Sequence, residues 1–548
     1  MFKKSILHTV IAVILLISIV LSGCSYQSPT GTVSKGNPIK ETQEPKEKGP
    51  YTLSITMPQD VLVEDYEMNA FTKHIEENCN IDIKFNFLPA DTAEAKNKLT
   101  LILSSGEKLT DVINMNLSET EAFAYGQDGI FLDLTEYYKT AVNIQKANNA
   151  YPQYNIVKNS MGPDGKTYFV PWLAKEEIGL APQKAWICQK FLDELSMKAP
   201  TNTQELYDFA KAIKKNDPNK NGSQDEIPIV GKKDSAAHWL MNAFIYYDTG
   251  NHYIVKDEVV DVAYRQEEYR EGLKYMHMLC KESLFSPLSF TMDLNQLKQL
   301  TDSDGQHHVV GIAFTFATSM LLNNYKENPF TKDYVGLAPI TGPNGVRTTS
   351  YAEPSVVPRW FITKDCKNPK LAFDVADFMW SEESYCLGRF GVKGVDWNSI
   401  DPAEKKQANI AGFVALINQP NSNWNKPQNS HWRTGCPTFS YDFLDSRLFD
   451  GNKLNPTYTA GLISQEYNKV LPPKGTFISN LKFMTEELNE INEIQATLKT
   501  YSEESLARFV TGDLNIESDW DNYIKELEKI GLKKFLEVSQ AAWDRMNK

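Results

Sequence analysis

The alternation of strand-like and helix-like segments in the first part of the chain constrains its fold more than any other feature. Residues 51–57 and 81–87 carry an apolar side chain at every second position, which is typical of half-buried strands. Residues 69–78 and 93–104 have the pattern of helices, and the short apolar run 111–115 is expected to be a third strand. Because parallel neighbours need a crossover connection, this order predicts a parallel sheet with helices on its faces, which is an α/β lobe.

The length and composition predict more than one folded body. With 548 residues, of which 41% are hydrophobic and 23% charged, the chain is an ordinary globular mixture and not a disordered or collagen-like one. This length favours two to four domains, or two large lobes in one chain. Further strands are expected at 309–316, 335–337 and 355–363, and helices at 369–380, 481–498, 518–530 and 532–546.

The charge balance bears on the class of partner. The chain has 57 Lys and Arg residues against 70 Asp and Glu residues, a formal net charge of −13, and no basic run of the kind that follows a phosphate backbone. We therefore expect no nucleic acid as the main partner. The acidic surface mainly keeps the protein soluble.

The N-terminus has the residue order of a secretory signal. Lys3 and Lys4 precede an uncharged, mostly apolar stretch, and the tetrad Leu-Ser-Gly-Cys ending at Cys24 resembles a bacterial lipobox. We expect residues 1–23 to be a signal peptide and Cys24 to carry the lipid (palmitate) anchor. The alternative is a permanent membrane anchor, but the apolar stretch is short for that. Residues 24–50 have few apolar side chains and are expected to form a disordered stalk.

Six cysteines remain besides Cys24, and none of them forms a CxxC pair. Six thiols outside the cell permit three disulfides, but spacing alone does not choose a pairing. Free buried thiols are an equal alternative in a chain of this size.

The loop at residues 217–228, with the sequence DPNKNGSQDEIP, is the sharpest motif. Side-chain oxygens occur at its positions 1, 3 and 5, glycine at position 6 and acids at positions 9 and 10. A Ca²⁺ ion prefers about six to eight oxygen ligands, and a tight turn of this kind can direct such oxygens to one point. The expected ligands of a structural calcium ion are Asp217, Asn219, Asn221, the Ser223 carbonyl, Asp225 and Glu226. Position 12 is Pro228 where an EF-hand has Glu, and an Asn- and Gly-rich surface turn is the alternative.

Aromatic residues suggest a second kind of site. The chain has 10 Trp, 25 Tyr and 27 Phe residues, and several Trp residues stand beside loop signals. Flat indole faces match the C–H faces of pyranose rings, and neighbouring Arg side chains can bind the hydroxyls. The candidate ligand-binding residues are Trp172, Trp239, Trp360, Trp432, Arg433 and Arg347. The alternative for each Trp is a place in the core, and for Arg433 a structural ion pair.

Motifs spread over nearly the whole chain resemble one family. They are the lipobox ending in Cys24, residues 165–171 (GKTYFVP), 199–205 (APTNTQE), the loop 217–228, and 509–513 (FVTGD) followed by 520–545. The chain resembles Gram-positive lipoproteins of the LplA type, among the family 1 extracellular solute-binding proteins of ABC importers, and is similar to alginate-oligosaccharide-binding proteins. In these relatives the loop binds calcium, which the resemblance carries to the same six residues here. Ser223 replaces a frequent Lys.

The resemblance implies two α/β lobes with a hinge and an interlobe cleft, as in periplasmic binding proteins. We expect lobe 1 at 51–170 plus about 310–345, and a helix-rich lobe 2 at about 171–309 plus 346–548. The implied function is capture of an oligosaccharide by a membrane-tethered, monomeric lipoprotein on the extracellular face of the bacterial membrane. The ligand is then delivered to ABC permease subunits without catalysis.

Two other functions remain open at this point. The chain lacks GxSxG, HExxH and phosphate-loop motifs, but carboxylate pairs for glycoside hydrolysis come together only on folding, so a secreted carbohydrate-active enzyme is one alternative. A binding protein for a peptide or another non-sugar solute is the other. Within the sugar hypothesis, Arg347, Arg359 and Arg433 suggest recognition of uronic-acid carboxylates.

Overall fold

The computed structural model describes residues 50–173, 179–324, 327–353, 356–399, 417–418, 426–433, 435–439, 456–478 and 480–547. The expected signal peptide, Cys24 and all of the expected stalk except Pro50 lie outside these residues. Of the helices that the structure describes, none has both the length and the apolar character of a membrane span.

The main strands form two sheets, each inside its own hydrophobic core. The first sheet has the order β2 (Ile81–Leu88), β1 (Tyr51–Pro58), β3 (Val112–Asn114), β11 (Val357–Ile362), β4 (Val170–Trp172). The second has the order β10 (Tyr334–Leu337), β5 (Lys184–Cys188), β9 (Val310–Thr315), β6 (Ile227–Gly231). We call the described residues of 51–173 and 356–439, around the first core, the first lobe. Those of 179–353 and 456–547, around the second core, are the second lobe.

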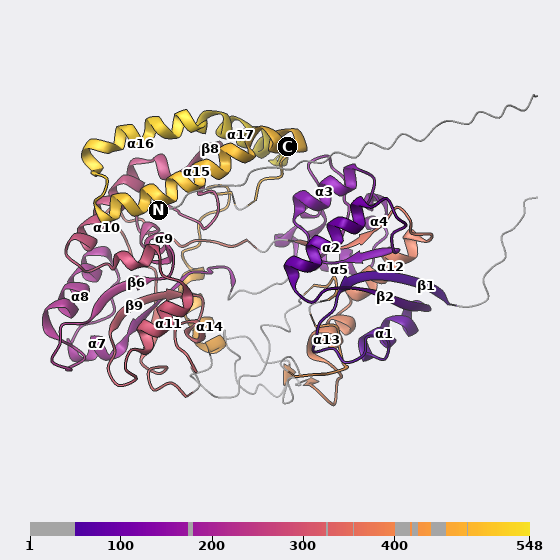
Figure 1. The fold of residues 1–548 in the computed structure, drawn as a ribbon, viewed down its shortest axis with the longest axis horizontal. Coiled ribbons are helices and arrows are strands. Elements are labelled where there is room, and N and C mark those ends of the chain that lie inside the picture. Colours follow the sequence, from indigo (N-terminus) through magenta and orange to yellow (C-terminus); the bar gives the residue numbers. More distant parts are fainter. Residues whose placement is uncertain are drawn as a thin grey trace, which may run out of the picture. The chain divides into compact units, whose positions relative to one another are not determined.

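The expected parallel arrangement in the first lobe is confirmed. Strands β2 and β3 both pair in parallel with β1, which buries Leu53, Ile55 and Met57. Helices α1 (Ala70–Cys79) and α2 (Thr92–Ser104) cover opposite faces of these strands (Figure 1). Asn69 and Asp91 cap the two helices, and each side chain accepts hydrogen bonds from first-turn amides. The carboxyl ends of β1, β2 and β3 therefore meet at one edge of the sheet.

The segment expected to return to the first lobe at about 310–345 is placed differently, which corrects the predicted lobe boundaries. Strand β9 pairs with β5 and β6, β10 pairs with β5, and all six residues of β9 are buried in the second core. The strand that returns to the first sheet is β11, antiparallel to both β3 and β4. An apolar run shows that a strand forms, whereas the sheet it joins depends on contacts far along the chain.

Helices and short strands complete both lobes. In the first lobe they are α3 (Glu119–Gln127), α4 (Thr135–Tyr138), α5 (Asn143–Ala150), α6 (Ile156–Asn159), α12 (Pro369–Met379) and α13 (Glu382–Phe390), with the pair β12 (Asn398–Ser399) and β13 (Ile417–Asn418). In the second they are α7 (Gln189–Glu194), α8 (Thr203–Asn216), α9 (Ser235–Met241), the hairpin β7 (Tyr253–Lys256) and β8 (Val259–Val262), α10 (Glu267–Lys281), α11 (Leu294–Asp302), α14 (Pro456–Asn468), α15 (Thr485–Thr511), α16 (Ile516–Ile530) and α17 (Leu532–Asn547). Helices α10, α15, α16 and α17 pack together, as Figure 1 shows.

Candidate functional site

A pocket of about 370 Å³ lies at the carboxyl edge of the first sheet. Residues that follow β1, β2 and β3 line it, together with the start of β11 and a segment around residue 433. Ligands of open α/β sheets bind at this edge where the strand order reverses, and here β2 and β3 lie on opposite sides of β1. The polar lining residues are Gln59, Asp60, Tyr66, Thr92, Asn116, Arg359 and Arg433.

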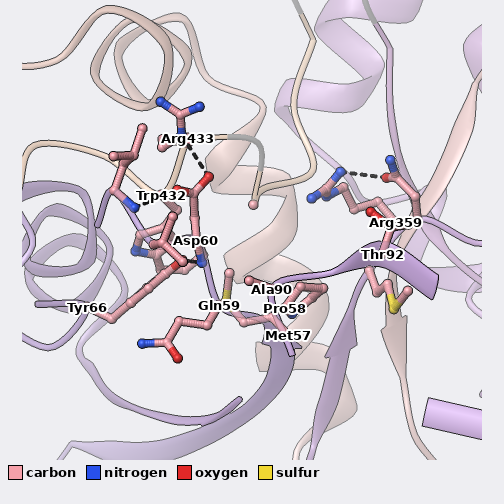
Figure 2. A pocket seen from close by; sticks show the side chains of 15 residues that line it. Met57, Pro58, Gln59, Asp60, Tyr66, Ala90, Thr92, Arg359, Trp432 and Arg433 are labelled. Atoms are coloured by element: carbon pink, nitrogen blue, oxygen red, sulfur yellow. Dashed lines mark hydrogen bonds and ion pairs between the residues drawn. The ribbon is translucent and has the colours of Figure 1, made fainter. Parts of the chain in front are cut away.

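Asp60 and Arg433 form an ion pair in one wall of the pocket (Figure 2). Arg433 Nε donates to Asp60 Oδ2 at 2.7 Å, and the two side chains are 17% and 27% exposed, respectively. The other Asp60 oxygen accepts the Leu62 amide at 2.9 Å, and the Asp60 amide donates to the Tyr66 hydroxyl at 2.9 Å. Arg433 has a left-handed backbone with φ of 58°, and its amide donates to His431 Nδ1 at 3.0 Å. The pair therefore presents an acceptor and a donor side by side, both held in place.

Tyr66 and His431, the two titratable side chains that accept hydrogen bonds from the backbone amides of this ion pair, are neutral. Burial raises the pKa of Tyr66 to about 12, so its hydroxyl stays protonated. Burial, reinforced by the positive charges of Arg433 and Arg389, lowers the pKa of His431 to about 4. At neutral pH, Asp60 and Arg433 are therefore the charged groups in this wall of the pocket.

Arg359 lies on the opposite side of the pocket (Figure 2). It belongs to β11 at the point where the register with β4 shifts, between Pro358 and Trp360. Such a bulge turns a side chain away from the regular alternation of a strand. Arg359 is 7% exposed, and its Nη1 donates to Asn116 Oδ1 at 2.5 Å. Burial lowers the pKa of its guanidinium to about 10, which still leaves it protonated at neutral pH.

Two of the three first-lobe tryptophans expected to stack on a sugar, Trp360 and Trp432, are packing residues here, which corrects that expectation. Trp360 is fully buried, and its indole donates to the Ala372 carbonyl at 3.1 Å. Trp432 reaches the pocket lining but is only 1% exposed, because its ring packs edge-on against Phe71 and Phe85. Neither ring has an open face for a pyranose.

The other three predicted ligand residues have different surroundings. Trp239, on α9, is 5% exposed in the second core, and its indole donates to the Tyr467 hydroxyl at 2.7 Å. Arg347 is an exposed second-lobe residue whose Nε donates to the Pro339 carbonyl at 2.7 Å. Trp172 ends β4 opposite Val357 and stays half-buried at the same edge of the sheet as the pocket. Its ring is partly exposed, but it does not line the pocket, so its sugar-stacking role stays a prediction.

Sequence reasoning missed Gln59, Asp60 and Asn116. Asp60 follows β1 by two residues, and Asn116 follows β3 by two residues. Their signal was position, because polar residues just beyond the carboxyl ends of parallel strands meet at one edge. Arg433 was predicted either as a ligand residue or as a structural ion-pair partner. It forms the ion pair and also lines the pocket, and its role in ligand binding stays a prediction.

The loop between α8 and β6 is shaped by side-chain to backbone hydrogen bonds. Asp217 Oδ2 accepts the Gly222 amide at 3.0 Å, Asn219 Oδ1 accepts the Asn221 amide at 2.9 Å, and Asn221 Oδ1 accepts the Ser223 amide at 2.7 Å. Gly222 has φ of 80°, a left-handed conformation that favours glycine. The motif therefore folds as the tight turn that its spacing predicted.

The carboxylates of this loop lack positive partners within the described residues. Glu226 is 2% exposed, and burial together with the nearby Asp217 and Asp225 carboxylates raises its pKa. Asp217 Oδ1 is buried, and no donor in the described chain reaches it. Asp225 accepts the side-chain amides of Asn219 and Asn221 at 3.0 to 3.2 Å. No three His, Cys, Asp or Glu side chains in the described ranges are close enough to hold a metal, so the calcium ligands stay a prediction.

The sequence pattern of the bacterial extracellular solute-binding proteins matches residues 61–385, which is more than half of the chain. The chain belongs to this family. The family predicted from the motifs is thereby confirmed, and the narrower likeness to the LplA type stays a prediction. A related solute-binding protein is the fructooligosaccharide ABC transporter substrate-binding protein FusA of Streptococcus pneumoniae serotype 4. It is 26% identical over 518 residues, which cover 86% of each chain.

Solved structures of other solute-binding proteins have the same fold. A solute-binding protein from Bifidobacterium longum infantis, described as HMO-binding and associated with an ABC transporter, matches with a TM-score of 0.73 and 21% identity. The match covers 91% of this chain and all of the other. The alginate-binding protein AlgQ2, in a structure without calcium ion, matches with a TM-score of 0.62 and 21% identity, over 91% of this chain and 98% of the other. The two-lobed α/β fold expected from the sequence is therefore confirmed.

Proposed function

We propose that this solute-binding protein captures an oligosaccharide outside the cell and delivers it unaltered to an ABC importer. The observation that carries the proposal is the first-lobe pocket, where a fixed ion pair meets the carboxyl edge of an α/β sheet in a member of this family. The FusA relative, named as a fructooligosaccharide-binding protein, supports the same ligand class.

The Asp60–Arg433 pair suits the hydroxyl groups of a sugar. Each hydroxyl donates one hydrogen bond and accepts others, so adjacent hydroxyls can donate to Asp60 and accept from Arg433. Gln59 and Asn116 add amide donors and acceptors beside the pair. Trp172 would supply an apolar face at the same edge.

Delivery needs two states, because the ligand must be held and then released. Contacts that the ligand makes with both lobes in the closed state favour closure by the difference in its affinity for the closed and open states. The closed form would dock on the permease subunits. The proposed mechanism makes or breaks no covalent bond, in keeping with relatives that are substrate-binding proteins.

The proposed attachment to the cell is a lipid on Cys24 followed by the stalk of residues 25–50. A flexible polar stalk keeps the binding lobes close to a membrane partner while leaving them free to turn. We propose that the protein works as a monomer.

We also propose that the loop of residues 217–228 holds a structural Ca²⁺ ion. The support is chemical, because a buried carboxylate oxygen on Asp217 and the crowded Glu226 gain a positive partner when a cation binds. The Asn219 and Asn221 side chains and the Ser223 carbonyl would add neutral oxygens. A structure of AlgQ2 is described as being without calcium ion, which is consistent with a calcium site in that relative.

The proposal is tested by calorimetric titration of residues 50–548 with a panel of purified oligosaccharides and peptides. We expect one saccharide class to bind, and Asp60→Asn to weaken its binding about tenfold or more, since a hydrogen bond to a charged group is lost. Asp128→Asn, at an exposed position after α3, is the matched control and should change nothing. Binding of peptides alone would reject the proposal, and chromatographic detection of cleaved products would favour the enzyme alternative.

A further inference from the structure

Arg359 is a buried cation that has no negative partner within the part of the chain that the structure describes. It is 7% exposed, and among the described residues the one group that exerts a charge effect on it is the Cys436 thiol. Burial raises the pKa of that thiol to about 11, so it carries no charge at neutral pH. Arg433, across the pocket, differs because its charge is balanced by Asp60. The distance from Arg433 Nε to Asp60 Oδ2 is 2.7 Å.

An unpaired charge is costly inside a protein. Removing a guanidinium from water costs free energy that is recovered only when an opposite charge and hydrogen-bond acceptors replace the water. Among the described neighbours of Arg359, Asn116 supplies one neutral acceptor, and Nε is buried with no acceptor in reach. An anion that binds in the pocket would offset this cost.

The geometry indicates which kind of anion fits. A charged guanidinium nitrogen makes a strong hydrogen bond to a carboxylate oxygen. Among the described residues, Asn116 accepts from Nη1 and Nε is buried, so Nη2 is the nitrogen that remains for a direct contact with a ligand in the pocket. The bulge between Pro358 and Trp360 fixes the backbone from which this side chain extends to the pocket.

The charges of the pocket as a whole point in the same direction. Among the described residues, the charged side chains that line it are Arg359, Arg433 and Asp60, which leaves one positive charge in excess. The complete chain, in contrast, has a net charge of −13. A neutral sugar would leave this positive charge uncompensated, whereas a carboxylate would pair with it.

We propose that Arg359 recognises a carboxylate of the bound oligosaccharide, so that the ligands of this protein are acidic, uronate-bearing oligosaccharides. The inference rests on the proposed sugar-binding function and adds the ligand's charge. Asp60 and Arg433 bind hydroxyls, and Arg359 selects the acid. Of the three arginines first considered for uronate recognition, Arg359 is the one that is both in the pocket and without a carboxylate partner within the described residues.

The test uses matched acidic and neutral ligands. Residues 50–548 are titrated calorimetrically with oligogalacturonates and oligomannuronates of about three to five units, with their methyl esters, and with neutral fructo-, malto- and manno-oligosaccharides. We expect the wild-type protein to bind an acidic oligosaccharide and to bind its methyl ester at least tenfold more weakly. The Arg359→Gln variant should have an affinity for the acid at least tenfold lower than the wild type, whereas its affinity for the ester should change less than threefold. Tenfold corresponds to about 1.4 kcal/mol, which is close to the lower end of the about 1.5–3 kcal/mol of a hydrogen bond to a charged group.

Controls separate folding from recognition. Arg508→Gln, on an exposed part of α15, removes the same charge outside the pocket and should leave every affinity unchanged. Arg359→Lys keeps the charge but loses the planar fork, and we expect an intermediate loss for the acid. If the melting curve of Arg359→Gln shows that this variant does not fold, Arg359→Lys is used as the test in its place.

Each outcome decides between the two proposals. If neutral oligosaccharides, or the methyl esters, bind as tightly as the acids, the inference about Arg359 is overturned and the sugar-binding proposal stands. If Arg359→Gln and Arg359→Lys both bind the acid like the wild type, the inference is likewise overturned. If no saccharide binds and peptides do, the proposed function fails, and the inference fails with it.

Discussion

Replacing Glu226 by Gln should change the stability of the second lobe in opposite directions with and without calcium. Glu226 is 2% exposed, and burial together with the Asp217 and Asp225 carboxylates raises its pKa. For a carboxyl whose pKa is raised by folding, the unfolded state loses its proton first, so stability falls as the pH rises above the unfolded value of about 4.3. At neutral pH without a cation, the charge of Glu226 is therefore destabilising, and the neutral amide removes that cost.

Calcium reverses the sign of this effect. A site with a dissociation constant of about 0.1 mM, typical of extracellular modules, stabilises the folded state by about 1.4 kcal/mol at 1 mM free ion. Loss of the Glu226 carboxylate should remove most of this gain. Without calcium, we expect Glu226→Gln to stabilise the lobe by about 1 kcal/mol, the usual size of a single-site effect. Each kcal/mol shifts the melting temperature of a lobe of this size by about 2–4 °C.

The assay is differential scanning calorimetry of residues 50–548 in 1 mM calcium chloride and in EDTA. The variant should melt above the wild type in EDTA and below it in calcium. Glu504→Gln, at an exposed position on α15, is the matched control and should behave alike in both buffers. The reasoning is refuted if calcium does not raise the melting temperature of the wild type, or if Glu226→Gln shifts it equally in both buffers.

Three further predictions follow from burial. Trp360→Ala should destabilise the first lobe by about 3–5 kcal/mol, because loss of the fully buried indole leaves a cavity. Trp172→Ala should cost less stability, because this ring is half-buried, and should weaken saccharide binding. Calorimetric melting measures the stability of both variants, and calorimetric titration measures the binding. Burial lowers the pKa of His238 to about 3, so stability should fall by up to about 1.4 kcal/mol per pH unit as the pH drops below about 6.5, and urea titrations of His238→Gln should show a shallower fall. The six described cysteines are free thiols, and burial raises the pKa of Cys436 to about 11, so Ellman's reagent should find few reactive thiols in the folded protein and six in guanidinium; fewer than six would indicate disulfides.

Local patterns predicted four of the five strands of the first sheet, β1, β2, β3 and β11, to within one or two residues, whereas β4 was not predicted. The expected strands 51–57 and 81–87 occur as Tyr51–Pro58 and Ile81–Leu88, because alternation of apolar side chains is a property of the strand itself. The helix expected at 481–498 was less well predicted, since α15 continues to Thr511. Its buried face there includes Ser502 and Ser505, whose small side chains pack closely but have no apolar signature.

The candidate site was only partly predictable, because it depends on burial and on long-range neighbours. Proximity to a loop signal suggested that Trp360 and Trp432 were accessible, but both rings are covered by first-core residues distant in the sequence. Asp60 and Arg433 are separated by 373 residues, so no local pattern could show that they pair. From the sequence alone, one can predict a parallel sheet, whose carboxyl edge is where ligands bind, and a small set of arginines that are candidates for contacting the ligand.

The two arginines of the pocket separate two kinds of recognition that are usually measured together. Arg433 is neutralised by Asp60, so its contribution depends on hydroxyl geometry and should be similar for acidic and neutral sugars of the same shape. Arg359 keeps its charge, so its contribution depends on the charge of the ligand. Replacing both members of the pair, Asp60→Asn together with Arg433→Gln, leaves the net charge of the pocket unchanged and should therefore weaken an acid and its methyl ester by the same factor. Arg359→Gln, in contrast, should change their ratio. The ratio of the two affinities, compared between the two variants, thus assigns shape and charge recognition to different walls of one pocket.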